Sequence, residues 1–281
     1  IGAETMKGSI SASTTLALGA RDVLLGGELI AGALTVDATR NLIMGANGLV
    51  YGQGDVALRG ADVTLDGVLY GARDVLVEAS QSFTDAGRSG AQRVADRDLT
   101  VRVLRDADLR LNGGQIYAAE RTLTLSTQGA LSVVGPPATG ETLLVAGTGD
   151  LVLSAPRGIT LGDRAVLYGG EGTVRLETPG RLALAAGHRV ETPGAISAVA
   201  PGIDFFGRWI ANGDVTLTPT DAAQNVVRIN DGASIQSGDV IAIRRANGVR
   251  DLDVVVKAGT SGGLLRGDVH VHANSLLVEQ P

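Results

Sequence analysis

The chain of 281 residues has no cysteine, few aromatic residues and no long apolar segment. The absence of cysteine excludes disulfide bonds and thiol chemistry. Aromatic residues make up 3 % of the sequence, so the core must be filled by Val, Leu, Ile and Ala instead of large rings. No apolar run approaches the roughly 18 residues that a membrane-spanning helix needs. Glycine is abundant, with 40 residues and no strict three-residue period, which favours frequent tight turns.

The net negative charge of the chain argues against partners that are themselves negatively charged. The formal net charge is −6 at neutral pH, and the pair Arg244-Arg245 stands alone instead of belonging to a basic patch. Nucleic acids and anionic membranes attract proteins through such patches. We therefore expect no nucleic-acid partner.

A degenerate phrase recurs along the chain: a small residue, in some copies a variable residue, then Asp and alternating aliphatic residues. It occurs at residues 20–25, 54–58, 61–65, 72–77, 149–153, 213–217, 238–240 and 267–271. In the copy at 61–65, Val63 and Leu65 point inward while the polar residues point outward. Every second strand start recurs after about 20 residues, which predicts an all-β solenoid with coils of about 20 residues.

The repeat is expected to form one domain over residues 1–281, with three loops protruding from the stack. Residues 80–98 are polar and poor in aliphatic side chains, and residues 135–140 read Gly-Pro-Pro-Ala-Thr-Gly, a typical turn composition. Residues 200–212 depart from the repeat because they contain a cluster of aromatic residues. Repeat phrases continue beyond this segment, so we interpret it as an insertion and not as a second domain.

Several phrases of the chain resemble filamentous haemagglutinin repeats. They are Gly-Arg-Leu-Ala-Leu-Ala-Ala-Gly at 180–187, Ala-Asn-Gly-Asp-Val-Thr-Leu at 211–217 and Leu-Arg-Leu-Asn-Gly-Gly-Gln-Ile at 109–116. Such repeats form the shafts of large two-partner-secreted bacterial exoproteins, which include adhesins and contact-dependent-inhibition toxins. The resemblance covers most of residues 15–280 and implies a right-handed parallel β-helix formed by a single chain.

The same resemblance implies a structural or adhesive shaft that mediates attachment or presents a distal module. The expected partners are a receptor or glycan on a host or neighbouring cell, and an outer-membrane secretion partner for the full-length protein. We expect a monomer, secreted or on the bacterial cell surface. The Asn-Pro-Asn-type motif of the family's secretion domain is absent, and the chain starts at Ile1 without a signal peptide. The sequence is therefore expected to be an interior or distal segment.

Two other functions of β-helical proteins stay open. A polysaccharide lyase, hydrolase or epimerase needs clustered Asp, Arg and His from adjacent coils. Asp-x-Asp pairs at 96–98, 106–108 and 251–253 each place two carboxylates on one strand face, but any alternating strand produces such pairs. A phage tailspike-like receptor-binding protein would be an intertwined trimer. We expect no enzymatic activity, no catalytic residues, no metal site and no cofactor.

The leading candidate for a binding site is the aromatic cluster. Phe205, Phe206 and Trp209, beside Arg208, are suited to an exposed platform for a sugar or a partner protein. Aromatic residues and arginine are typical anchors of interfaces. The alternative interpretation is that the rings cap the stack or pin a loop onto it.

A second candidate is Arg266-Gly267-Asp268, which matches the integrin-recognition tripeptide. Gly-Asp-Val at 267–269 is also the repeat's own turn phrase, so the match has a structural explanation. Asp268, His270 and His272 alternate along one strand and share its outer face, as a transition-metal set or as a solvated polar surface. The recurrent Asp residues before strands are expected to accept hydrogen bonds from turn amides.

Overall fold

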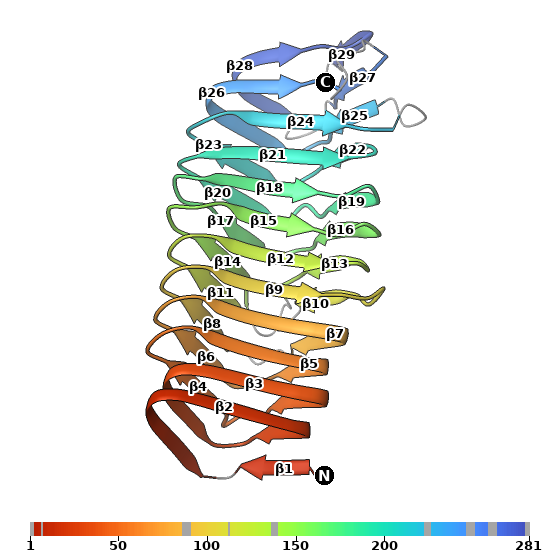
Figure 1. Ribbon diagram of the computed structural model, residues 1–281. Coiled ribbons are helices and arrows are strands. Elements are labelled where there is room, and N and C mark those ends of the chain that lie inside the picture. Colours follow the sequence, from red (N-terminus) through yellow and green to blue (C-terminus); the bar gives the residue numbers. More distant parts are fainter. Residues whose placement is uncertain are drawn as a thin grey trace.

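A computed structural model of the chain describes residues 3–6, 8–85, 91–111, 113–135, 140–221, 226–245, 251–257 and 263–278. These residues form 29 β-strands and no helix, so none of them belongs to a helix that could cross a membrane. The strands pair in parallel and stack coil on coil into a solenoid (Figure 1). The predicted all-β parallel solenoid is confirmed.

Each coil has three faces, and each face is a ladder of short parallel strands. The first face contains β4 (Leu49–Gly52), β6 (Val68–Gly71), β8 (Gln92–Ala95), β11 (Ile116–Ala119), β14 (Thr142–Ala146), β17 (Ala165–Tyr168), β20 (Arg189–Thr192) and β23 (Arg208–Ala211). The second face contains β9 (Leu99–Val103), β12 (Leu123–Thr127), β15 (Leu151–Ser154), β18 (Thr173–Glu177), β21 (Ala195–Ala200) and β24 (Val215–Pro219). The third face contains β1 (Ala3–Met6), β10 (Leu109–Leu111), β13 (Leu131–Val133), β16 (Gly158–Leu161), β19 (Arg181–Leu184), β22 (Ile203–Phe205), β25 (Val226–Ile229), β27 (Asp253–Val256) and β29 (Ser275–Val278).

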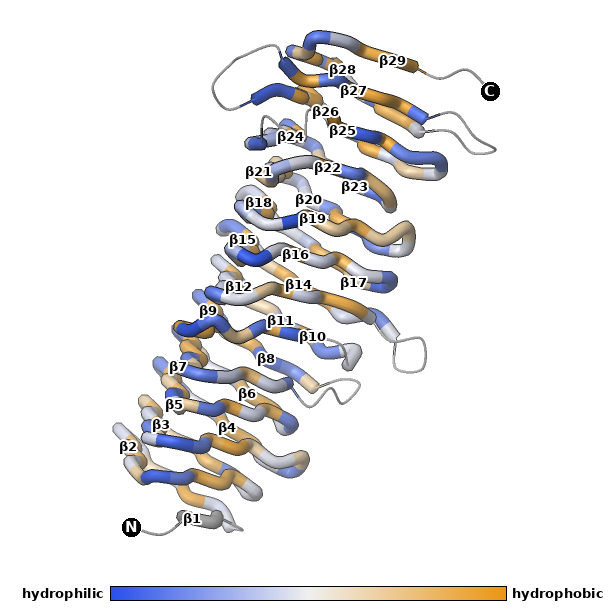
Figure 2. Tube along the Cα trace, turned by 90° about the vertical axis from the view of Figure 1, so that its right-hand side faces the viewer, coloured by the Kyte–Doolittle hydropathy of each residue, from blue (hydrophilic) through white to orange (hydrophobic). Residues whose placement is uncertain are grey.

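Longer strands run around the corners between faces. They are β2 (Ser9–Leu25), β3 (Glu28–Met44), β5 (Val56–Leu65), β7 (Val75–Asp85), β26 (Ser234–Ile243) and β28 (Leu264–Val271). In Figure 1 the chain rises from its N-terminus while the second face crosses the front from left to right. It then turns back along the third face, which faces the viewer in Figure 2. This path is right-handed, as the resemblance implied.

The coils are longer than the sequence period predicts. The stack has about 11 turns of roughly 23 residues, whereas the period of the repeat phrases predicts about 20 residues per coil. The predicted length holds in the first coils, where Val23 pairs with Leu42 and Val63 pairs with Phe83. Later coils are longer because extra residues enter the connections: residues 104–108 separate β9 from β10, whereas β5 turns the same corner within one strand.

The interior consists of rows in which equivalent residues of successive coils stack on one another. On the first face, one inward row contains Leu29, Val50, Leu69, Arg93, Tyr117, Leu144, Leu167, Val190, Trp209 and Ile235. The second inward row contains the small residues Ala31, Gly52, Gly71, Ala95 and Ala119. These residues are small because the second face begins directly beside them: a Cβ on Gly52 would lie 2.3 Å from Val56 Cγ2.

The predicted protruding loop at 80–98 is wrong for most of its length. Strand β7 continues to Asp85 and strand β8 lies within the stack, while residues 86–90 lie outside the described residues. The segment is poor in aliphatic side chains because two of its inward positions hold an ion pair. Asp85 and Arg93 are both buried, with Arg93 Nη2 3.1 Å from Asp85 Oδ2.

The predicted loop at 200–212 is also wrong, since β22 and β23 occupy most of it. Here the inward positions carry aromatic side chains, which the aliphatic repeat pattern does not contain. Of the predicted loop at 135–140, residues 136–139 lie outside the described residues. A single domain over 1–281 stays a prediction.

A tyrosine and a carbonyl group complete the buried ion pair. Tyr117 OH donates to Asp85 Oδ2 at 2.5 Å, and Arg93 Nη1 donates to the Gly67 carbonyl at 2.5 Å. Burial, and then the charge of Asp85, raise the pKa of Tyr117 well above its ordinary value. The phenol therefore keeps its proton at neutral pH, and the cluster connects β7, β8 and β11.

We predict that Arg93→Leu lowers the free energy of unfolding by about 3–5 kcal/mol, because it leaves Asp85 charged and unpaired with arginine in the core. Leucine suits the position sterically, since Leu69 is the equivalent residue one coil earlier. The double variant Arg93→Leu/Asp85→Asn, which keeps an acceptor for Tyr117, is expected to regain most of the loss. Urea denaturation followed by circular dichroism measures both variants. A single variant as stable as the parent chain contradicts the role of the ion pair.

Candidate functional site

The structure divides the predicted aromatic platform between the core and the surface. Phe205 and Trp209 are fully buried, and their rings meet edge to face with centroids 4.9 Å apart. The interpretation of these two residues as an exposed platform is therefore wrong, because the strand alternation turns both inward. Phe206 and Arg208 point outward, and Phe206 keeps 37 % of its surface exposed.

The buried aromatic pair fixes the protonation state of His188. Trp209 Nε1 donates to His188 Nε2 at 2.8 Å, and His188 Nδ1 lies 2.5 Å from the carbonyl oxygen of Ala185. An indole N–H only donates, so Nε2 is the unprotonated nitrogen and Nδ1 carries the hydrogen. Burial lowers the pKa of His188, although the hydrogen bond to Ala185 acts in the opposite direction. The imidazole is a neutral member of the core.

The tripeptide Arg266-Gly267-Asp268 lies on β28, where this strand turns from the first face to the second. All three residues are exposed, and Gly267 has φ of +150°, which side-chain-bearing residues rarely adopt. The glycine is therefore explained by the corner. Asp268 lies 3.3 Å from His270 Nε2. Within the described ranges, no three His, Asp or Glu side chains gather closely enough to hold a metal ion.

The recurrent Asp residues join successive coils instead of closing their own turns. Asp74 Oδ1 accepts from the amide of Asp98 at 3.3 Å, and Asp98 Oδ1 accepts from the amide of Thr122 at 3.1 Å. The same bond joins Asp55 to Asp74, Asp150 to Thr173 and Asp214 to Val240. Arginines of the following coil pair with several of these carboxylates, as Arg121 does with Asp98 at 2.8 Å. The expected acceptor is confirmed, and the donor is a main-chain amide at the equivalent corner of the following coil.

The three Asp-x-Asp pairs make contacts of the same kind. Asp96 accepts from Tyr70, Asp98 pairs with Arg121, Asp106 with Arg157, Asp108 with Arg110, Asp251 with Arg245, and Asp253 accepts from Ser275. The hydrogen bond to Asp96 is the main reason that the pKa of Tyr70 rises to about 12. Four of these partners lie in another coil, whereas Arg110 and Arg245 lie within six residues of their Asp in the sequence.

A trough on the third face gathers exposed groups from consecutive coils. Its larger part, with a volume of about 700 Å³, lies over the starts of β19, β22 and β25. Its smaller part, of about 430 Å³, lies over β16 and β19 and reaches Phe206. Arg181 and Asp204 line both parts, so the two hollows adjoin. Volumes of this size are typical of ligand sites.

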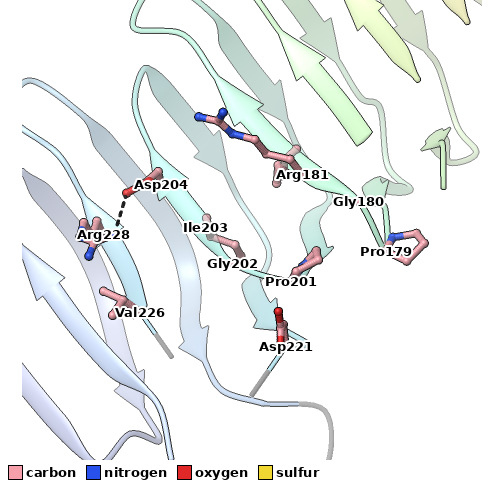
Figure 3. A pocket seen from close by; sticks show the side chains of 11 residues that line it. Pro179, Gly180, Arg181, Pro201, Gly202, Ile203, Asp204, Asp221, Val226 and Arg228 are labelled. Atoms are coloured by element: carbon pink, nitrogen blue, oxygen red, sulfur yellow. Dashed lines mark ion pairs between the residues drawn. The ribbon is translucent and has the colours of Figure 1, made fainter. Parts of the chain in front are cut away.

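Figure 3 shows how the larger part is built. Pro179, Pro201 and Asp221 stand on the side where the strands begin, and Arg181 and Asp204 extend over the face. Asp204 Oδ1 lies 3.6 Å from Arg228 Nη1, which the dashed line marks. Arg181 forms no ion pair with any described residue, in contrast to the arginines along the corners.

The chemistry of the trough is that of a binding surface. The main-chain groups beneath it are used in the pairings of β19 with β16 and β22 and of β22 with β25. The trough therefore offers side chains to a ligand: guanidinium and carboxylate groups suited to paired hydrogen bonds, and proline rings and Phe206 as apolar surface. Phe206 is the member of the predicted aromatic platform that belongs to this site.

Sequence reasoning missed the trough because its residues come from different coils. Pro-Gly occurs at 179–180 and at 201–202, each directly before a third-face strand, but also at 193–194, before the second-face strand β21. Proline lacks an amide donor and ends a strand pairing, so the dipeptide marks corners of the coils without identifying the trough.

Comparisons with protein-family models, with curated proteins and with solved structures find no match to this chain. The resemblance to filamentous haemagglutinin repeats, and the two-partner secretion that it implies, stay predictions.

We predict that acidification destabilises the stack through His188. Because burial lowers the folded-state pKa, the unfolded chain takes up a proton first as the pH falls below the ordinary value of 6.5. Stability is therefore complete above that value and declines as the pH falls toward the folded-state pKa. Trp209 is the sole tryptophan, so fluorescence-monitored melts between neutral and acidic pH report on this region directly.

The matched variant is His188→Gln, whose amide oxygen accepts from Trp209 without titrating. It is expected to show a shallower decline of Tm with falling pH than the parent chain. Equal slopes for the two proteins would assign the decline to other groups and contradict the prediction.

Proposed function

We propose that this chain is a structural and adhesive shaft segment of a large secreted bacterial surface protein, and that it binds a glycan along the trough. Its action is mechanical and interfacial: it holds a distal module away from the cell and adds contact surface of its own. Export through an outer-membrane partner and a host-cell or neighbouring-cell target belong to the same proposal.

The observation that carries the proposal is the continuous stacking of coils. Each coil bonds to the next through its main chain, and Asp carboxylates and arginines add coil-to-coil contacts along the corners. Such a molecule is extended along one axis and is stabilised by contacts between neighbouring coils. At the usual strand spacing of about 4.8 Å, about 11 coils span about 53 Å.

The trough supports an adhesive role in addition to a spacer role. A peptide that adds a strand needs unpaired main-chain groups, and those beneath the trough are already paired. A glycan needs none, because hydroxyl and carboxylate groups are bound by side chains such as Arg181 and Asp204. The trough crosses the strands, so an extended glycan that follows it meets one coil about every 4.8 Å, close to the length of one pyranose unit.

We predict that the chain is retained on at least one member of a panel of bacterial and host polysaccharides without releasing new chain ends. Arg181→Ala is expected to weaken that binding roughly tenfold or more, as expected for a lost hydrogen bond to a charged group. The matched control is Arg102→Ala on the second face, which removes an exposed arginine paired with Glu78 and leaves the trough intact. Retention is measured by affinity electrophoresis and chain ends by a reducing-end assay.

The outcomes separate the possible functions. Release of chain ends would indicate a polysaccharide-active enzyme instead of a shaft. Retention that Arg181→Ala and Arg102→Ala weaken equally would place the glycan elsewhere than in the trough. Absence of retention on every polysaccharide would leave a shaft without an adhesive surface and remove that half of the proposal.

A further inference from the structure

The outward side of the first face breaks the alternation seen elsewhere in the stack. On β4, β6, β8, β11, β14 and β17, one outward row contains Tyr51, Tyr70, Val94, Ala118, Val145 and Tyr168. The parallel row on the same strands is aliphatic except for Gln92. We call these two rows the apolar strip. Outward residues of the second and third faces are mostly threonine, serine and charged residues.

Most residues of the strip are partly exposed, although Val166 keeps only 5 % of its surface exposed. The rings of Tyr51 and Tyr70 stack with centroids 4.9 Å apart and planes 15° apart. Val68 and Tyr168 keep 39 % and 44 % of their surface exposed. Charged residues end one row on both sides, since Glu28 precedes Leu49 and Arg189 follows Val166. The other row continues to Ile30 at one end and meets Glu191 at the other.

Folding does not require apolar residues on this outward side. Parallel strands that are apolar on both sides are typical of sheets covered on both sides. Six strands at about 4.8 Å spacing, each contributing about four residues of width, give a strip of roughly 370 Å². Apolar patches of this size on a protein surface commonly mark interaction sites.

We propose that the apolar strip packs face to face against the same strip of a second copy of this chain. A two-fold axis through the strip midpoint, between β8 and β11, places each strip on the other with the coil order reversed. The same rotation brings Glu28 opposite Arg189, so the ends of this row are complementary in charge, although Arg189 also pairs with Glu141 and Glu191 of its own chain. At the ends of the other row it brings Glu191 opposite Ile30. Val94 of one copy then faces Ala118 of the other, across the roughly 10 Å that separates packed sheets.

The area sets the strength of this association. Two facing strips bury roughly 740 Å², less than the roughly 1,600 Å² of a standard stable interface. The dimer is therefore weak and reversible in solution, and it is favoured where many copies are held close together. This inference goes beyond the proposed function and departs from the monomer expected from the sequence. It uses a different face from the trough.

Sedimentation velocity over a wide range of protein concentration tests the proposal. The mean mass is expected to rise from one chain toward two in the parent protein. Leu143→Arg, at an outward position of the strip, is expected to shift this rise at least tenfold to higher concentration. Thr160→Arg on the third face is the matched control and is expected to leave the rise unchanged, and circular dichroism verifies that both variants fold.

The absence of native cysteine allows a second test that locates the interface. Val94→Cys and Ala118→Cys chains, mixed and treated with a short bis-maleimide, are expected to form a crosslinked dimer, whereas Thr160→Cys chains are not. A constant mass of one chain, equal effects of Leu143→Arg and Thr160→Arg, or equal crosslinking by all variants would overturn the proposal. A mass of three chains would favour the tailspike-like trimer instead. Arg181→Ala is expected to dimerise normally, so failure of glycan binding and failure of dimerisation are distinguishable.

Discussion

The whole molecule depends on the parallel main-chain hydrogen bonds that join each coil to the next. Strands of three to six residues are too short to persist alone, so each is stable because its neighbours in the ladder are in register. Register requires that equivalent positions carry compatible residues, which is why the interior consists of rows. A row accommodates a polar residue where that residue has partners of its own. Arg93 stands between Leu69 and Tyr117, pairs with Asp85 and donates to the Gly67 carbonyl.

The fold was predictable because the corners leave a local signature. The recurrent Asp before a second-face strand serves as a coil-to-coil acceptor, and the alternating aliphatic residues after it fill the inward rows. The prediction failed where inward residues were not aliphatic. Asp85 and Arg93, like Phe205 and Trp209, keep the alternation of a strand, but they do not match an aliphatic repeat pattern, which therefore predicts loops for their segments.

The trough was not predictable in the same way, because it requires the register between coils. Asp204 pairs with Ala183 of the preceding coil and with Arg228 of the following coil, and these two coils differ in length. The coil that runs from Leu131 to its partner Ile159 on the same face is longer than either. Because the coil length varies in this way, the sequence cannot place Arg181, Asp204 and Arg228 together. An error of a single position in the register turns a side chain from the outside to the inside.

The stacking of coils restricts which residues occupy inward positions but places few restrictions on outward positions. Once coil stacking satisfies the main chain, an outward substitution away from the corners has little effect on stability. Each face is therefore able to acquire its own chemistry without altering the coil beneath it. The second face is polar and ion-paired, the third carries Arg181 and Asp204 over a hollow, and the first is apolar over six strands. Since neither the trough nor the apolar strip is required by the stack, a selective advantage in binding is the simplest reason for both. Because the trough and the apolar strip lie on different faces, the proposed glycan binding and the proposed dimerisation are compatible with each other.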